Sequence, residues 1–182
     1  MLFIHPQKDR WHAPRGEDGP PVSIPAEPHL LLELPQWHAA RAQWPAHLPV
    51  GLLLANDQDV EALDEDLHRF ALLALRFPKW TDGRAYSQAR LLRSRFGFAG
   101  QIRATGDVLV DMLPLLARTG FDAAVLRADQ SIDAAERALE FFNGHYQGDT
   151  HQKRPPFALP PGSAERLVCK PEREFIQQGA SI

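Results

Sequence analysis

Strand-like runs and amphipathic segments alternate from residue 50 to residue 142 of the chain. The short runs predict buried strands at residues 50–56, 72–77, 101–105 and 123–128. After each run, apolar residues recur at intervals of three or four, which predicts helices at residues 60–70, 85–96, 108–119 and 131–142. The pattern is therefore a β-α unit repeated four times.

The ends of these helices carry their own signals. Gly97 and Gly120 follow the second and third predicted helices, where glycine readily adopts the left-handed conformation that ends a helix. Asp107 is placed to cap the third helix, and Ser131 is placed to cap the fourth. Pro114 falls inside the third predicted helix, so we expect it to kink or shorten that helix.

Repeated β-α units require parallel strands joined by right-handed crossovers, so the sequence predicts an α/β fold with a four-stranded parallel sheet. Two architectures fit, namely half of a TIM-like barrel and an open doubly wound sheet. We favour the half-barrel because Arg76, Arg103 and Arg127 occur one per strand near the strand ends, as if lining one concave face. Four strands cannot close a barrel, so an N-terminal hairpin, a helix or a second copy in a homodimer must cover the edges.

The chain divides into three parts around this repeat. Residues 1–49 form an N-terminal extension, in which Leu2, Phe3 and Ile4 are expected to pair in a short hairpin that packs on the core. Residues 50–148 form the β/α core domain, and residues 149–182 form a Pro-rich C-terminal tail.

Composition narrows the functional classes. The chain has 182 residues, 44% of them hydrophobic, which suits one domain with an ordinary core. A pI near 6.2 argues against general nucleic-acid binding, and no apolar run approaches the ~20 residues that a membrane span needs. Without a secretory signal at the start, the expected location is the cytoplasm. The single cysteine, Cys169, excludes an internal disulfide and the thiolate set of an iron–sulfur cluster.

Charge is concentrated in one stretch of the chain. Residues 76–103 hold seven basic side chains and one acid, a balance of +6, whereas the whole chain is -3. Because the ends of parallel strands and the helix N-termini share one sheet edge, we expect an anion-binding rim there. The expected ligand is a small oxyanion or a phosphate-bearing molecule. The rim residues are Arg76, Lys79, Arg84, Arg103 and Arg127.

The same edge supplies the candidate catalytic residues, which are Lys79, Asp82, Arg84 and Asp107. Pairing of Arg76, Arg103 and Arg127 with Asp82, Asp107 and Asp129 is an equally good explanation of the charges, with no ligand at all. The residues alone establish no reaction.

Familiar cofactor and metal signatures are missing from the sequence. No GxGxxG follows a predicted strand, no GxxxxGK[ST] occurs, and the eight histidines form no HExxH. We therefore predict no metal site and leave the cofactor unknown. A flavin is still compatible with the sequence, because half-barrel rims bind phosphates without a fixed motif.

The segments FPKWTDGRAYSQARLLR, IRATGDVL and GFDA together resemble a bacterial family classed as a domain of unknown function. The resemblance covers about residues 50–147. Members are commonly labelled oxidoreductases of sulfite reduction, and their genes are often found beside a sulfite reductase gene. The chain departs from the family pattern at Trp80, Ala85, Val110, Met112 and Thr119, the last of which replaces a cysteine.

The resemblance implies a role in sulfur assimilation, either as an oxidoreductase or as an accessory protein whose partner is sulfite reductase. It supplies no catalytic residues, so whether the protein is an enzyme stays open. Two alternatives stand beside this expectation. One is a non-catalytic dimeric interaction module, and the other is an enzyme that binds a phosphate-bearing ligand or flavin.

Overall fold

A computed structural model describes residues 1–14, 24–141 and 145–160 of the chain. Six parallel strands form one open sheet, flanked by helices, so the predicted parallel α/β fold is confirmed with two more strands than expected. The strands are β1 (Leu2–Phe3), β2 (Leu30–Glu33), β3 (Val50–Leu54), β4 (Phe70–Phe77), β5 (Gln101–Gly106) and β6 (Ala123–Ala124).

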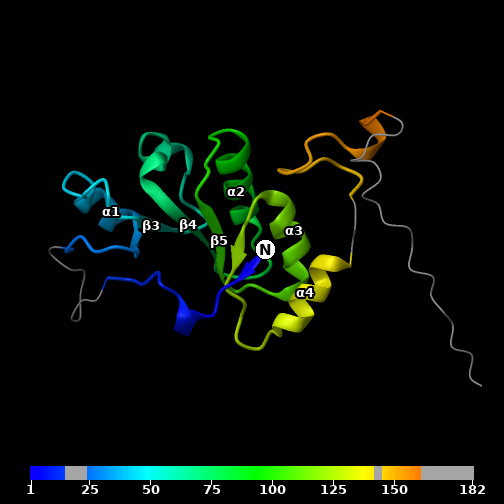
Figure 1. Cartoon of the computed structure of the whole chain (residues 1–182), viewed down its shortest axis with the longest axis horizontal. Helices are drawn as coiled ribbons and strands as arrows, with labels where there is room; N and C mark the ends of the chain where they lie inside the picture. Colours follow the sequence, from blue (N-terminus) through cyan, green and yellow to red (C-terminus); the bar gives the residue numbers. More distant parts are fainter. Residues whose placement is uncertain (15–23, 142–144, 161–182) are drawn as a thin grey trace, which may run out of the picture.

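The strand order is β1-β6-β5-β4-β3-β2, so the chain steps in one direction from β2 to β6. Right-handed crossovers in one direction place every connection on the same face. The step from β1 to β2 runs the opposite way and therefore belongs on the other face. The sheet is covered on both faces and does not close (Figure 1). It is therefore consistent with the open doubly wound sheet, which was the alternative to the half-barrel favoured from the sequence.

The connections contain short helices, and Figure 1 shows α2, α3 and α4 lying in succession along one side of the sheet. The α-helices are α1 (Leu34–Ala40), α2 (Arg84–Ser94), α3 (Leu113–Thr119) and α4 (Ile132–Glu140). The 3-10 helices are η1 (Pro6–Lys8), η2 (Glu61–Arg69), η3 (Val110–Met112) and η4 (Pro156–Ala158).

Alternation along the strands divides the buried residues between the two faces. In β4, Leu73, Leu75 and Phe77 point into the core formed with the helices, whereas Leu72 and Ala74 are buried on the opposite face. Trp37 of α1 and Leu92 of α2 are completely buried on the helical side. One face is therefore an apolar helix-sheet core, and the other needs a separate cover.

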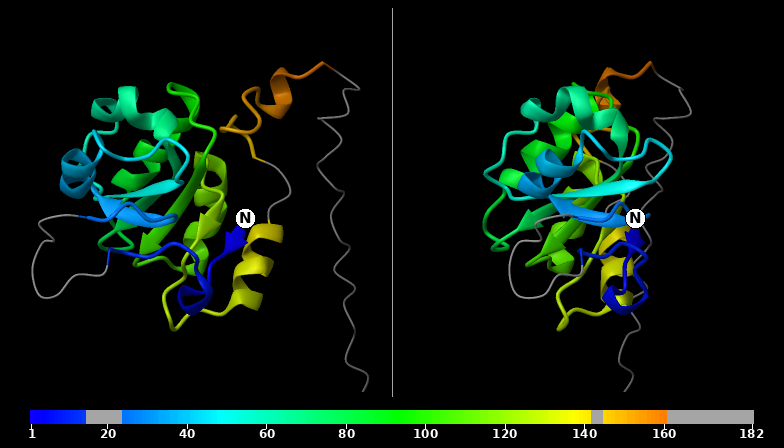
Figure 2. Two further views of the ribbon diagram at one scale, coloured as in Figure 1. Left: turned by 60° about the vertical axis from the view of Figure 1, so that its left-hand side comes forward. Right: turned by 90° about the vertical axis from the view of Figure 1, so that its left-hand side faces the viewer.

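The N-terminal segment supplies that cover, and it corrects the predicted hairpin. Leu2 and Phe3 pair in parallel with β6, while His12 forms an isolated parallel bridge with Leu30 of β2. Figure 2 shows this segment, in blue, starting beside α4 and running across to β2. Trp11 is 7% exposed, and a side chain added at Gly51 would meet its ring at 3.0 Å. Residues 1–12 thus link the two outer strands.

The helix signals are confirmed in part. Gly97 and Gly120 have φ of 63° and 105°, and the Ser131 hydroxyl accepts a hydrogen bond from Ala134 N as expected. The predicted Asp107 cap is wrong, because this region folds as η3 and α3. Pro114 lies in the first turn of α3, where its missing N–H breaks no hydrogen bond, so the helix is not kinked. It is shorter than predicted, because it begins at Leu113 and not at residue 108.

Part of the predicted tail packs on the core. Thr150 donates to the carbonyl of Arg118 through its backbone nitrogen at 3.2 Å and through its hydroxyl at 3.0 Å, and Leu159 is buried. Residues 161–182, including Cys169, lie outside the described residues. Among the described helices, none is both long enough and apolar enough to cross a membrane.

Candidate functional site

The candidate site lies at the carboxyl edge of the sheet, where Gly106 brings two loops together. Gly106 has a φ of 95°, and a Cβ at this position would lie 2.3 Å from the carbonyl oxygen of Phe77. Only glycine permits this approach. It allows Asp107 N to donate to Phe77 O at 2.8 Å, which fixes Asp107 beside the loop that follows β4.

Asp107 connects three loops of this edge. Its carboxylate accepts a hydrogen bond from Trp80 N at 2.9 Å and forms an ion pair with Arg127 at 2.8 Å. Arg127 also binds Asp129 through two hydrogen bonds of 2.6 and 2.7 Å. The Trp80 N–H, followed by Arg127, lowers the pKa of Asp107, and Arg127 lowers the pKa of Asp129 to about 2.

A second ion pair lies at the start of α2. Asp82 accepts two hydrogen bonds from the Arg84 guanidinium, at 3.0 and 2.7 Å, which hold the pKa of Asp82 well below its usual range. Asn56, at the end of β3, is 8% exposed and lies close enough to Asp82 to lower that pKa further. Its Nδ2 atom is buried and lies outside hydrogen-bonding geometry with every described acceptor.

Two predicted rim cations have no carboxylate partner among the described residues. Arg76 and Lys79 are exposed, and neither side chain forms an ion pair within the described ranges. Trp80, next to Lys79, is 53% exposed although it is a large apolar side chain. In the described part of the chain, the loop between β4 and α2 therefore presents one free cation, Lys79, and an exposed indole to solvent, and Arg76 is a second free cation near the end of β4.

Arg103 does not lie at this exposed edge. It occurs in the middle of β5 and is 4% exposed beneath the N-terminal segment, where it forms an ion pair with Asp9 and a 3.0 Å hydrogen bond with Gln101. The structure thus brings Lys79, Asp82, Arg84, Asp107 and Arg127 to one edge and places Arg103 elsewhere. That all five cations bind one anion stays a prediction.

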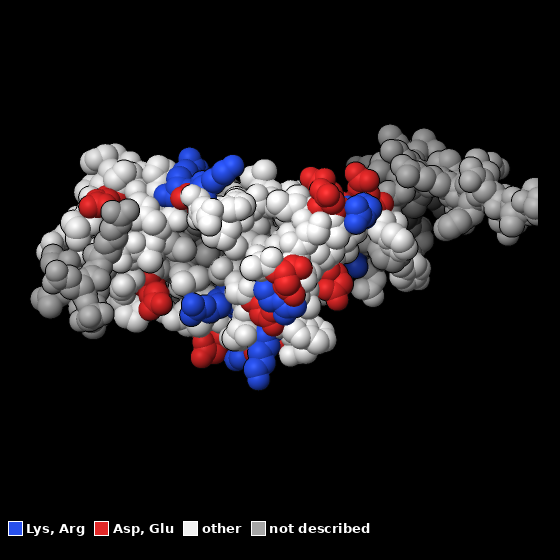
Figure 3. Space-filling view, turned by 90° about the horizontal axis from the view of Figure 1, so that it is seen from below, with Lys and Arg blue, Asp and Glu red and all other residues white. Residues whose placement is uncertain are grey.

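Internal pairing accounts for part of the charges of this edge. Arg127 pairs with Asp107 and Asp129, as the ligand-free interpretation expected, but Arg103 pairs with Asp9 instead. Figure 3 shows Lys and Arg side chains lying beside Asp and Glu in small groups on the face that it presents. Arg84 and Arg127 already have carboxylates in the positions that a bound oxyanion would take. An external anion would have to compete with them.

Sequence reasoning missed the roles of two polar side chains of α2, one at this edge and one at the opposite edge of the sheet. Near the end of α2, the Arg93 guanidinium binds Asp122 and the carbonyls of Gly120, Phe98 and Gly100, which precede β5 and β6. Gln88 donates to the carbonyls of Ala55 and Gln58, at 2.9 and 2.8 Å, and so ties α2 to the loop after β3. A polar residue in the apolar stripe of a predicted helix was the available signal for Gln88.

The ionisation states limit the chemistry of the candidate residues. Asp82 and Asp107 have lowered pKa values, so they are carboxylates at neutral pH and accept protons poorly. Burial, and then Asp111, raises the pKa of Tyr86 to about 12, so its phenol stays protonated. Within the described ranges, no group of three or more His, Cys, Asp or Glu side chains is placed to hold a metal ion.

Comparison with known proteins identifies a family whose activity is unknown. No curated protein matches the chain. A family described as "Bacterial protein of unknown function", DUF934, matches residues 51–157, which is more than half of the chain and includes both ion-pair groups of the edge. The chain belongs to this bacterial family of unknown function.

Proposed function

We propose that this protein is an accessory protein of assimilatory sulfite reduction that binds sulfite reductase through the loop between β4 and α2. The link to sulfite reduction rests on the family resemblance of the segment FPKWTDGRAYSQARLLR, whose first half forms this loop. The observation that carries the docking surface is Trp80, which is 53% exposed on a loop that the fold holds in place.

Two hydrogen bonds from backbone N–H groups hold the middle of the loop. Asp82 N donates to Lys79 O at 2.9 Å within the turn, and Trp80 N donates to the Asp107 carboxylate at 2.9 Å. A loop that is already ordered loses little conformational entropy when a partner binds. The backbone carrying Trp80 is therefore prepared for binding.

The side chains of the loop have the composition of a binding hot spot. Trp and Arg contribute most often to the binding energy of protein interfaces, and here Trp80 lies between Lys79 and the ion pair of Arg84. The unpaired charges of Lys79 and Arg76 favour a partner with an acidic surface and accelerate its association.

Co-purification tests this proposal. The tagged protein should retain the sulfite reductase of the same bacterium, and retention should weaken as the salt concentration rises. Trp80→Ala should reduce retention at least about tenfold, because a buried hot-spot aromatic contributes roughly 2 kcal/mol. Phe157→Ala is the matched control, since Phe157 is a comparably exposed aromatic in the segment 145–160. Equal retention by wild type and Trp80→Ala would contradict the docking surface.

Growth provides an independent test of the pathway. Deletion of the gene should slow growth on sulfate as the sulfur source, and added cysteine should restore it. Normal growth on sulfate after deletion would contradict the role in sulfite reduction, whatever the protein binds.

A second candidate is an enzyme that binds a small oxyanion beside Asn56. It is favoured by the buried Nδ2 of Asn56, which lies near the Asp82 carboxylate but outside hydrogen-bonding geometry. In this candidate the Asp82 carboxylate occupies the position of the oxyanion on Arg84. Asp82→Asn should then tighten the binding of sulfite, sulfate or phosphate in calorimetry. Absence of binding by both proteins, with no flavin in the absorption spectrum, would leave only the accessory role.

A further inference from the structure

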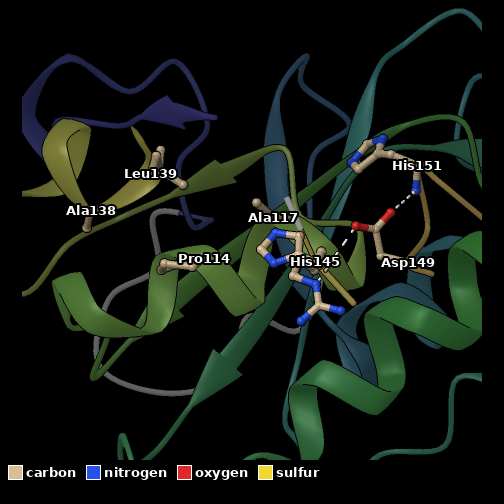
Figure 4. Close-up of a pocket in the computed structure, with 8 residues that line it drawn as sticks. Pro114, Ala117, Ala138, Leu139, His145, Asp149 and His151 are labelled. Carbon is tan, nitrogen blue, oxygen red and sulfur yellow. Dashed lines mark hydrogen bonds and ion pairs between the residues drawn. The ribbon is translucent and has the colours of Figure 1, made fainter. Parts of the chain in front are cut away.

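A cleft of about 150 Å³ lies far along the chain from the loop after β4, between α3, α4 and the segment that starts at His145. Figure 4 shows its lining residues. The apolar wall consists of Pro114, Ala117, Ala138 and Leu139. The polar wall consists of Arg118, His145, Asp149 and His151.

The polar wall is held in place by the backbone. Thr150 is bound twice to the carbonyl of Arg118, which fixes residues 149–151 against the last turn of α3. Asp149 Oδ1 accepts hydrogen bonds from His151 N at 2.9 Å and Gln152 N at 2.7 Å. One oxygen of this carboxylate is therefore fully used by the segment itself, and Oδ2 is left for another partner.

That partner is Arg118, but the two groups do not close into a hydrogen-bonded pair. Asp149 Oδ2 lies 3.9 Å from Arg118 Nε, compared with 2.7 Å between Arg84 and Asp82. Arg118 Nε is buried and has no hydrogen bond with any described group, and Nη2 makes only a 3.3 Å bond to Gln147 O. The cleft thus holds a cation and a carboxylate that are both under-coordinated.

The remaining groups define the ligand further. His145 is partly buried beside Arg118, and burial together with the Arg118 charge lowers its pKa, so at neutral pH it is an uncharged donor and acceptor. A ligand with only a negative charge would be repelled by Asp149, and a ligand with only a positive charge would be repelled by Arg118. A molecule that carries both charges satisfies both groups, and the size of the cleft restricts it to a few non-hydrogen atoms beyond these charges.

We propose that this cleft binds a small zwitterion of the free α-amino acid class, with the ligand carboxylate on Arg118 and the ligand ammonium on Asp149. The α-carbon substituent then rests on Ala117 and Leu139. This site is separate from the loop proposed to bind sulfite reductase and does not depend on that function.

Three probes of nearly the same skeleton test the ligand class. L-Alanine carries both charges, propionate lacks the ammonium and ethylamine lacks the carboxylate. In a ¹⁵N NMR titration of the full chain, L-alanine should shift the amides of Ala117, Leu139 and His145 with a dissociation constant of the order of 1 mM. Propionate and ethylamine should bind at least about tenfold more weakly. Equal binding of propionate, or no shifts at these amides with L-alanine, would overturn the proposal.

Substitutions test the placement. Arg118→Gln and Asp149→Asn should each weaken L-alanine binding at least about tenfold, and Asp149→Asn retains the oxygen that caps residues 151 and 152. Ala117→Leu fills the cleft without changing its charges and should also abolish binding. Arg137→Gln, an exposed change on α4, is the matched control and should bind like wild type. If Ala117→Leu keeps its melting temperature and still binds L-alanine normally, the cleft is not the site.

Discussion

The buried arginines of the fold and the arginines at the carboxyl edge of the sheet have different roles, although they carry the same guanidinium group. Arg103 and Arg93 have side chains that are 4% and 18% exposed and bind groups from distant parts of the chain. Arg84 and Arg127 are 57% and 43% exposed, and most of their partners lie two residues away. The first pair joins segments of the fold, whereas the second mainly orders the loops that carry it.

The cluster of basic residues in the sequence therefore contains two kinds of side chain, those that hold the fold together and those that are available for binding. A desolvated arginine must keep its partners, because an isolated buried charge is very unfavourable. An exposed ion pair contributes little to folding, and water or a ligand can replace either partner. Substitutions should therefore separate an architectural set from a set available for binding.

The largest expected effect comes from Arg103, which belongs to the architectural set. Arg103→Ala removes the partner of Asp9, which is 15% exposed, and should lower the free energy of unfolding by about 3 kcal/mol. For a chain of this length, that corresponds to a fall of roughly 6–12 °C in Tm, measurable by calorimetry or circular dichroism.

Arg95→Ala is the matched control, because Arg95 pairs with Glu61 and these side chains are 60% and 44% exposed. It should cost less than about 1 kcal/mol. Similar losses of Tm in the two variants would show that the distinction between the sets is wrong.

The next effect concerns the backbone that joins the edge loops. Gly106→Ala combines a positive φ with a contact of 2.3 Å to backbone and should cost about 2–3 kcal/mol in chemical denaturation. Gly97→Ala has a positive φ but no atom within 4 Å of the new Cβ, so it should cost about 1 kcal/mol. If the two costs are equal, the close approach at Phe77 is unimportant.

The pH dependence of stability tests the ion pair between Arg127 and Asp129 at the carboxyl edge. Arg127→Gln should raise the pKa of Asp129 from about 2 toward its ordinary value of 3.8. The pKa can be measured from the NMR chemical shift of the Asp129 carboxyl carbon as the pH changes. Because the folded pKa is lowered, the stabilisation by this pair is complete above the unfolded pKa and disappears as the pH falls from about 4 through about 2. Arg84→Gln should leave the pKa of Asp129 unchanged.

The smallest expected effect belongs to the unpaired cations. Lys79→Ala and Arg76→Ala should change Tm by no more than about 2 °C, since both side chains are exposed and form no ion pair within the described ranges. They should nevertheless weaken retention of sulfite reductase, measured at low salt. A large loss of Tm would place these residues in the architectural set.

Periodicity predicted the parallel core because each strand from β3 to β6 is followed by a helical segment. Leu2 and Phe3 were correctly predicted to pair as a strand, but their partner β6 could not be predicted, because it is distant in the sequence. The same limit applies to charges. The Asp82–Arg84 pair is local and could be foreseen, whereas Arg103 with Asp9 and Arg93 with Asp122 depend on tertiary structure.

The pairing of Leu2 with Ala123 also constrains biosynthesis. At roughly 5–20 residues per second, a ribosome needs about 6–24 s to add the 121 residues between these positions. Throughout that interval β1 has no neighbour in the sheet, and the surface that it and residues 5–12 later cover is exposed on the nascent chain. Pairing of β1 with β6 therefore has to follow the synthesis of every strand that lies between them in the sequence.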